Sequence, residues 1–352
     1  MNNDNLNELL YVEDETPTPS FDEKREKRTF SRLGFGFALF SLISLAVSLV
    51  IQVIVLFAAP EFFESKIFLN MLSPVSMYLF ALPVLLLIIF GMKAEPPKKR
   101  RMGFWKWVLF LIIGFGLMYI GNYIGQTVML ILSNIVGYDY SNALNSLVGT
   151  DSLWATFIFM VIVAPIGEEF VFRKLLIDRT QKYGGFVSVL LSGLIFGLMH
   201  GNFYQFFYAF ALGLLLGYVY YSTGKIHLTI AIHAVINFFG SVVATLLTEA
   251  MDKMYADMET LMTASDMETV LGFYAEHGFT MLFMMAFSFF VFGAMICAIV
   301  LPIVLRKKIV LEKGEIEIPK GRAISTVVLN AGMIVMLVVY ILEFVLNLIP
   351  AA

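Results

Sequence analysis

Six polar side chains of types that carry out chemistry lie inside long apolar runs between residues 153 and 237. They are Glu168, Glu169, Arg173, His200, His233 and Asn237. Five of the six are ionisable, and an ionisable group at membrane depth costs about 2.5–3.5 kcal/mol on insertion scales. We therefore expect these groups to serve chemistry or transport.

Pairs of residues in this stretch, each with at least one polar member, repeat a spacing of four. The pairs are Glu169 and Arg173, Phe196 and His200, and His233 and Asn237. On a helix, residues i and i+4 lie on one face, so each pair can present two groups to the same cavity. Three apolar segments with such pairs predict a polar site inside a helix bundle.

The two adjacent acids are predicted to differ in role. Their side chains are offset by about 100° around a helix, so Glu168 and Glu169 face different directions. Glu169 has Arg173 four residues on, and an ion pair between them would reduce the cost of burying both. Glu168 has Phe172 at that position, which leaves its carboxylate for general base chemistry. The two histidines and Asn237 complete a set that can activate water and stabilise an oxyanion.

The composition places these residues in a membrane protein. Of the 352 residues, 59% are hydrophobic and 14% are charged, and the mean hydropathy is +0.82, whereas soluble domains carry about 25% charged residues. The single cysteine, Cys297, excludes an intrachain disulfide and a cysteine metal cluster. The apolar runs predict an all-α, polytopic membrane helix bundle of about eight to nine transmembrane helices with a polar intramembrane cavity.

The apolar runs and the polar stretches between them divide the chain into five parts. We predict a disordered, basic-ended cytoplasmic tail, N-terminal transmembrane helices, a catalytic core, an acidic extracytoplasmic loop and C-terminal transmembrane helices, at residues 1–32, 33–152, 153–248, 249–277 and 278–352. Four glycines of the third predicted span should permit close helix approach; they are Gly114, Gly116, Gly121 and Gly125.

Charge alternates between the predicted loops. Basic residues cluster in the N-terminal tail and after the second, fourth and eighth predicted spans, and most other loops are acidic or neutral. The positive-inside rule therefore places the N-terminus in the cytoplasm, and an odd count near nine would place the C-terminus outside. Residues 249–277 hold seven carboxylates against Lys253, and His277 is expected to be solvated there. Glu343 of the last span has no evident partner in the sequence.

The spaced pairs resemble the motifs of a known family. Residues 168–173 (EEFVFR) match EExxxR, residues 196–200 (FGLMH) match FxxxH, and residues 233–237 (HAVIN) match HxxxN. In this order they look like the CAAX protease and bacteriocin-processing (CPBP, or Abi) family, which includes the type II CAAX prenyl proteases. The resemblance covers about residues 150–245, and it implies a multi-pass intramembrane protease, expected in a bacterial plasma membrane.

The resemblance also implies a role for each motif residue. Glu168 and His200 would activate the attacking water, and His233 and Asn237 would stabilise the oxyanion. The remaining pair, Glu169 and Arg173, would hold the site together.

Two mechanisms stay open, because proteins of this family are commonly called metalloproteases. Glu168, His200 and His233 can supply three zinc ligands and leave a fourth position for water. Alternatively, the same residues carry out a metal-free mechanism in which Glu168 is the base. Glu168 cannot be a zinc ligand and the base at once.

The leading hypothesis is an intramembrane endopeptidase that hydrolyses peptide bonds of membrane-associated substrates, of CAAX or leader-peptide type. Its expected partners are the lipid bilayer and a membrane-associated peptide or protein, without nucleic acid. The alternative is a non-enzymatic immunity or scaffold protein of the same family. An ion-coupled transporter is a further alternative, which the lack of an evident internal repeat disfavours. The chain contains no HExxH pattern, which excludes the usual zincin arrangement.

Overall fold

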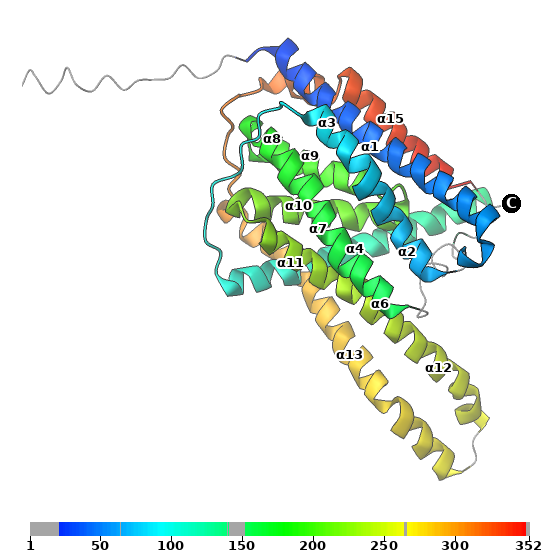
Figure 1. The fold of residues 1–352 in the computed structure, drawn as a ribbon. Coiled ribbons are helices and arrows are strands. Elements are labelled where there is room, and N and C mark those ends of the chain that lie inside the picture. The colour runs from blue at the N-terminus through cyan, green and yellow to red at the C-terminus, as the bar shows by residue number, and fades with distance from the viewer. Residues whose placement is uncertain (1–20, 64, 139, 141–151, 264–265, 350–352) are drawn as a thin grey trace, which may run out of the picture.

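The computed structural model describes residues 21–63, 65–138, 140, 152–263 and 266–349, and these residues fold into a bundle of helices (Figure 1). Seven helices are long and apolar enough to cross a membrane, and a bent pair, Lys320–Val327 with Ala331–Leu346, makes an eighth when it is counted as one span. A shorter apolar helix covers Gly185–Leu198. The described residues contain no strand, and the predicted all-α, polytopic bundle is confirmed.

The first and last long helices lie side by side. Helix α1 (Glu23–Ala58) packs along α15 (Ala331–Leu346) (Figure 1). The contact is close enough that a Cβ on Gly332 would lie 1.7 Å from the carbonyl oxygen of Ser31. In lipid, helices associate through such close packing rather than through hydrophobic burial. The next elements are α2 (Lys66–Pro74), a π-helical segment (Val75–Ala81), α3 (Leu82–Ile89) and α4 (Phe104–Val136).

The segment that carries the EExxxR residues crosses the bundle as one continuous helix of α-helical and π-helical turns, called here the motif helix (Leu153–Tyr183) (Figure 1). It comprises α6 (Leu153–Thr156), a π-helical segment (Phe157–Val163), α7 (Ala164–Glu169), a second π-helical segment (Phe170–Ile177), α8 (Asp178–Thr180) and a 3₁₀ turn (Gln181–Tyr183). π-Helical turns within α-helices are frequent at functional sites. Here one of them begins directly after Glu169.

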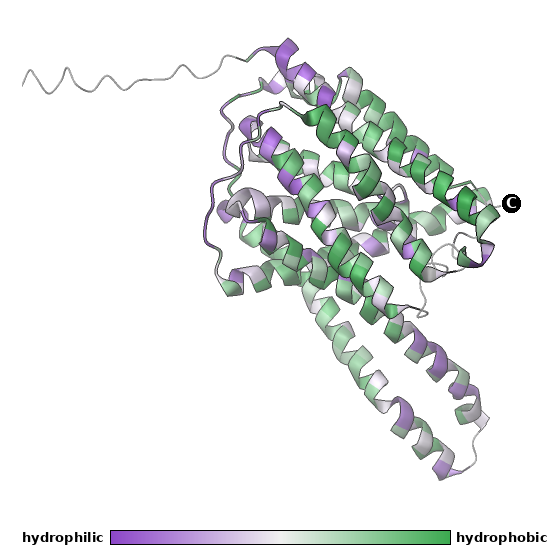
Figure 2. Cartoon of the chain, viewed as in Figure 1, coloured by the Kyte–Doolittle hydropathy of each residue, from purple (hydrophilic) through white to green (hydrophobic). Residues whose placement is uncertain are grey.

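The remaining helices follow the motif helix along the chain. They are α9 (Gly185–Leu198), α10 (Phe203–Thr223), α11 (Ile226–Asn237) with a π-helical segment (Phe238–Val243), α12 (Ala244–Thr263), α13 (Met267–Val304) and α14 (Ala323–Val327). The far halves of α12 and α13 project together beyond the other helices (Figure 1). Figure 2 shows polar residues at the tip of this projection and, at the opposite end of the molecule, around the N-terminus of α1.

Glycines bring α4 into backbone contact with two neighbours, as the sequence predicts. A Cβ on Gly121 would lie 2.4 Å from the Cα of Tyr208 on α10, and one on Gly116 would lie 2.1 Å from the carbonyl oxygen of Ala294 on α13. These approaches have no room for a larger residue. They fix α10, which packs directly on α9 and α11.

Two apolar clusters lie on either side of the candidate site. One contains buried side chains of α1, α3, the motif helix, α9 and α15, and it includes Phe172 and Phe196. The other joins α4, α10, α11 and α13, and it includes Ile232 and Ile236. The polar motif residues therefore lie where the two clusters meet.

The linkers that the charge pattern predicts on one side of the membrane do lie together. The amide of Glu95 donates to the carbonyl of Asp178, and the amide of Arg100 donates to that of Thr223, at 2.6 and 2.9 Å. From the later linker, the amide of Ile316 donates to the carbonyl of Lys182 at 2.9 Å. Both linkers thus run across the ends of the motif helix and α10.

The predicted N-terminal tail, residues 1–32, overlaps the first ten residues of a helix. Helix α1 begins at Glu23, capped by the Asp22 side chain, which accepts the amide of Lys24 at 3.0 Å. Glu26 and Phe30 are fully buried. The many basic residues of this stretch led to the prediction of a disordered tail, but one face of the helix they form packs against the bundle. Residues 1–20 of the predicted tail lie outside the described residues.

The prediction of an acidic loop at residues 249–277 is wrong, because α12 and α13 occupy most of it. His277 was expected to be solvated, yet it is 3% exposed and its Nε2 lies 2.9 Å from the Asp257 carboxylate. Asp266 caps α13 by accepting the amide of Thr269 at 2.7 Å. The Asp266 cap and the contact between His277 and Asp257 explain how this acidic sequence forms two helices. Glu343 also has a partner, since the Ser41 hydroxyl donates to it.

Candidate active site

Two adjacent acids on the motif helix are held differently. Glu169 is fully buried, whereas the Glu168 side chain is 15% exposed. The helix backbone beside them packs on a ring, since a Cβ on Gly167 would lie 2.2 Å from Cζ of Tyr78. The Tyr78 hydroxyl donates to the carbonyl of Ala164 at 3.3 Å. This contact fixes the motif helix against the π-helical segment Val75–Ala81, and no motif in the sequence indicates Tyr78.

Glu169 forms a buried ion pair with Arg173. The Arg173 Nε and Nη2 atoms lie 3.0 and 3.3 Å from the two carboxylate oxygens, and neither side chain is exposed. Nη1 donates to Oγ of Ser192 at 2.6 Å, and that hydroxyl donates to the carbonyl of Phe172 at 2.8 Å. A buried ion pair is stable only when its remaining donors are satisfied, and Ser192 meets this need.

A second bond of Glu169 reaches α11. The Nδ1 atom of His233 lies 3.1 Å from Oε1 of Glu169. Because a carboxylate held by Arg173 accepts hydrogen bonds, this ring nitrogen carries a proton. The other nitrogen, Nε2, faces Oε2 of Glu168 at 3.6 Å. His233 thus stands between the two acids, and its side chain is 3% exposed.

His200 lies at the end of α9, where the chain turns through Gly201 with φ +65°. Its Nδ1 atom lies 2.8 Å from the carbonyl oxygen of Phe196. A carbonyl can only accept, so Nδ1 carries the proton and Nε2 stays free as an acceptor. The Phe196 ring contacts both histidines, with centroids 5.1 Å from His200 and 5.8 Å from His233.

Ser192 was missed as a site residue, although the sequence held a signal for it. Ser192, Phe196 and His200 follow one another at intervals of four. On a helix this spacing makes one continuous face. Ser192 holds Arg173, and Phe196 separates the histidine rings, so the face serves the site along its whole length.

Asn237 ties α11 to the motif helix. Its Nδ2 atom donates to the carbonyl of Met160 at 2.9 Å, in the first π-helical segment. The second N–H of the amide and the side-chain oxygen remain for other partners. Its predicted role as an oxyanion donor therefore rests on that second N–H.

The six predicted residues divide into two layers by exposure. Glu169, Arg173 and His233 are buried, and Glu168, His200 and Asn237 are partly exposed. His233 belongs to the buried layer, beside the ion pair. Within the described part of the chain, no direct hydrogen bond or ion pair joins Glu168 to His200.

The three predicted zinc ligands do not converge in this arrangement. Among the described residues, the group of three whose candidate ligand atoms all lie within 4.8 Å of one another comprises Asp257, Glu276 and His277, far along the chain. Glu168, His200 and His233 do not form such a group. A tetrahedral zinc site needs each ligand atom at about 2 Å from the metal. These side chains do not meet that requirement as they are placed.

The motif region also matches a protein family by comparison. The family model described as type II CAAX prenyl endopeptidase Rce1-like matches residues 150–239. The predicted resemblance to type II CAAX prenyl proteases is confirmed over this segment. The matched segment, called here the Rce1-like segment, contains all three motifs, the motif helix and α9 to α11. Together with the long apolar helices, this match points to an integral, multi-pass membrane protein. No curated protein and no solved structure matches the chain.

Proposed function

We propose that this protein is an intramembrane endopeptidase in which Glu168 is the general base. The observation that supports this most strongly is the contrast between the two adjacent acids. Glu169 is fully buried and bonded to Arg173 and His233, whereas Glu168 is partly exposed and faces the Nε2 atom of His233. A carboxylate that is accessible, and held beside a histidine, is suited to accept a proton from water.

The contact between Glu168 and His233 requires a proton. An ionised carboxylate and the Nε2 atom of a neutral ring are both acceptors, so at 3.6 Å they need one proton or a bridging water between them. With the proton on Nε2, His233 is an imidazolium that can donate to an oxyanion. Glu168, Glu169, Arg173 and protonated His233 then sum to zero charge, which suits apolar surroundings.

The proposed reaction consumes one water. Glu168 accepts a proton from the water as the water oxygen bonds to the carbonyl carbon of the scissile peptide. The developing oxyanion receives hydrogen bonds from His233 and from the free N–H of Asn237. When the C–N bond breaks, the proton held by Glu168 passes to the leaving nitrogen. The products are a carboxylic acid and an amine, which become a carboxylate and an ammonium group when the acid proton passes to the amine, and Glu168 is again a carboxylate. The free Nε2 of His200 orients the water as a second acceptor.

The proposed mechanism uses no metal, because the ligand set does not converge and Glu168 is needed as the base. The proposed substrate is a membrane-associated peptide of CAAX or leader-peptide type, consistent with the family of the Rce1-like segment. We further propose that the N-terminus lies in the cytoplasm of a bacterial cell, with the protein in the plasma membrane. The basic residues around the start of α1 and the two linkers beside it support this orientation.

The decisive experiment measures cleavage in proteoliposomes. Wild-type protein is offered a labelled peptide with a prenylated CAAX end, the same peptide without the prenyl group, and a leader peptide. Products are read by mass spectrometry beside those of Glu168→Gln and of Glu61→Gln, an exposed acid outside the site. We expect Glu168→Gln to lose cleavage and Glu61→Gln to keep it. Retained cleavage in Glu168→Gln sinks the proposal. If Glu168→Gln restores the phenotype of cells that lack the protein as well as the wild type does, the immunity or scaffold alternative is favoured.

A further inference from the structure

A small pocket at the end of the motif helix is lined by an unusual concentration of positive charge. It encloses about 320 Å³. Its lining includes six basic side chains and no acidic one: Arg25, Arg28, Arg32, Lys93, Arg179 and Lys182. We call this the basic pocket. Six like charges around one small space repel one another, so the arrangement favours an anionic ligand.

The lining comes from three elements far apart in the sequence. Three arginines belong to the first turns of α1, Lys93 follows the Gly91 turn after α3, and the other two cations end the motif helix. Gly91 has φ +77°, a conformation that favours glycine. The start of α1, the end of α3 and α8 lie near one another at one end of the bundle (Figure 1), where polar residues collect (Figure 2).

Most of this charge is not balanced by carboxylates. Arg25 pairs with Glu26 at 2.7 Å, and Lys93 pairs with Glu95 at 2.5 Å. Three of the other cations contact carbonyl oxygens or an aromatic ring instead of a carboxylate. Arg32 donates to the carbonyl oxygens at the end of α3, Arg179 donates to the carbonyl of Leu175 at 3.1 Å, and Lys182 lies over the Tyr183 ring at 5.0 Å.

One donor of the lining side chains has no acceptor. The Nε atom of Arg179 is buried without a hydrogen-bond partner among the described residues. Buried donors are almost always satisfied, and an exception calls for a missing partner. A guanidinium group prefers a planar, bidentate oxygen acceptor such as phosphate. The orphaned donor therefore points to an oxyanion in or beside the basic pocket.

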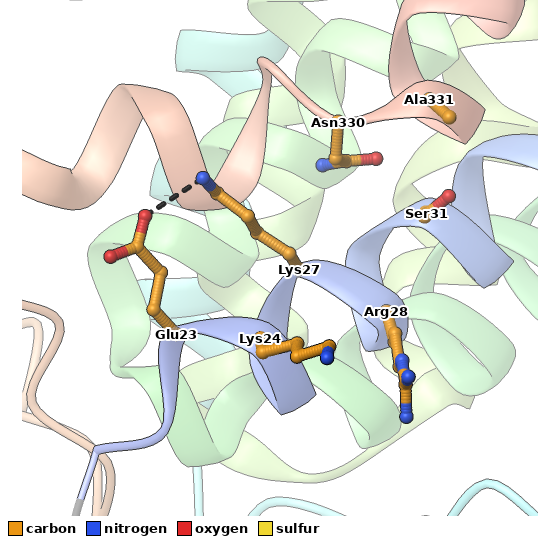
Figure 3. A pocket seen from close by; sticks show the side chains of 7 residues that line it. All are labelled: Glu23, Lys24, Lys27, Arg28, Ser31, Asn330 and Ala331. Atoms are coloured by element: carbon orange, nitrogen blue, oxygen red, sulfur yellow. Dashed lines mark ion pairs between the residues drawn. The ribbon is translucent and has the colours of Figure 1, made fainter.

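The neighbouring pocket makes a useful contrast. It is larger, about 550 Å³, and lies between the start of α1 and the start of α15 (Figure 3). Arg28 lines it as well, but Lys27 there is paired with Glu23 at 2.8 Å. The N–H groups at the start of α15 are already capped by Asn330 and Ser31. Its charge is partly neutralised, so the basic pocket is the stronger anion site.

We propose that the basic pocket binds the phosphate group of an anionic phospholipid. The pocket lies at the ends of apolar spans, on the side where the basic linkers gather. The ends of membrane-spanning helices lie at the level of the lipid headgroups. Basic pockets between spanning helices on the cytoplasmic side are typical sites for anionic lipids. A phosphate held there joins α1, the end of α3 and the motif helix, so the lipid stabilises the frame on which Glu168 and Glu169 are mounted.

The test compares two triple variants that remove the same charge. R28Q/K93Q/K182Q removes three cations from the basic pocket. R306Q/K307Q/K308Q, its matched control, removes three exposed cations from the turn after α13. Each protein is purified in a neutral detergent, and binding of phosphatidylglycerol, phosphatidylcholine and inorganic phosphate is measured by native mass spectrometry and by thermal unfolding. The single variant R28Q repeats the test if the first triple variant does not fold.

The expected result is selective. Phosphatidylglycerol should bind wild type and the control alike and raise their Tm, and phosphatidylcholine should not. Binding to R28Q/K93Q/K182Q should weaken by about tenfold or more, because charge-assisted hydrogen bonds to phosphate are lost. Equal phosphatidylglycerol binding by the two triple variants overturns the proposal, since it would reflect net charge alone. Tight binding of inorganic phosphate that R28Q/K93Q/K182Q abolishes, with no effect of the lipid, overturns the lipid source and assigns the pocket to free phosphate.

Discussion

The Nδ1 atom of His233 lies 3.1 Å from Oε1 of Glu169, a residue 64 positions earlier on another helix. The same carboxylate holds Arg173 in a bidentate ion pair. Glu169 therefore fixes the ring of His233 and directs its second nitrogen toward Glu168. Partners of this kind determine which histidine nitrogen is free to react. The adjacent acids serve one site in two ways, one as support and one as reactant.

Glu168→Gln should abolish peptide cleavage and leave the fold intact. The amide has nearly the same shape but cannot accept the proton of the water, and general base catalysis contributes roughly 10²–10⁴-fold. The side chain is partly exposed, so the substitution should change Tm little. Single-turnover cleavage and thermal unfolding of the purified protein measure the two quantities. Loss of folded protein together with activity would show that Glu168 is structural instead.

Glu169→Gln should lower the stability of the fold as well as cleavage. It leaves Arg173 buried without a counter-charge, and breaking a buried ion pair costs about 3–5 kcal/mol. We expect a low yield of folded protein and a large fall in Tm, with cleavage lost in whatever remains. Ser192→Ala serves as the graded companion, since it removes one hydrogen bond to Arg173 and should cost about 1.5–3 kcal/mol. A Glu169→Gln protein as stable as wild type would contradict the arrangement described here.

The sequence predicted the contact within one helix of the site, and it did not predict the contacts between helices. The pairing of Glu169 with Arg173 is an i,i+4 contact within one helix, so spacing alone predicts it. The bonds from His233 to Glu169 and from Asn237 to Met160 join different helices. Their geometry depends on π-helical turns and on helix packing, which spacing does not reveal.

The largest error concerned the segment after α11, where composition was taken as a sign of a loop. Seven carboxylates suggested solvent, yet the residues form helices, and His277 is buried against Asp257. Polar composition and helical structure are compatible when a helix projects beyond the bundle, because one face can remain in water. The count of spans was better predicted, since length and hydropathy alone decide it.

His277→Ala should loosen the projecting part of α12 and α13 without disturbing the motif region. The substitution removes the contact of His277 with Asp257 and opens space beside the Phe273 ring, whose centroid lies 4.7 Å from that of His277. Hydrogen exchange should rise in residues 250–280 and stay unchanged in residues 160–240. Met262→Ala, at an 81% exposed position of the same projection, should leave exchange unchanged. Faster exchange in the motif region would refute the independence of the two parts.

Gly121→Ala should destabilise the bundle even though alanine is the better helix former. The new Cβ would lie 2.4 Å from the Cα of Tyr208, a backbone atom that cannot move aside cheaply. Overpacking of this kind costs about 1–3 kcal/mol. Gly293→Ala is the matched control on α13, because no heavy atom lies within 4 Å of its added Cβ. We expect a lower Tm for the first variant and an unchanged or higher Tm for the second.

Metal removal separates the two mechanisms that the motifs left open. In the structure, Glu168, His200 and His233 are not among the groups of three whose ligand atoms lie close together, and the proposed mechanism gives Glu168 the role of base beside His233. Cleavage by purified protein should therefore survive prolonged treatment with a strong zinc chelator, and added zinc should not raise its rate. The assay needs a zinc protease as a positive control for the chelator. Loss of activity that zinc restores, together with about one zinc per chain by elemental analysis, would make Glu168 a ligand and remove it as the base.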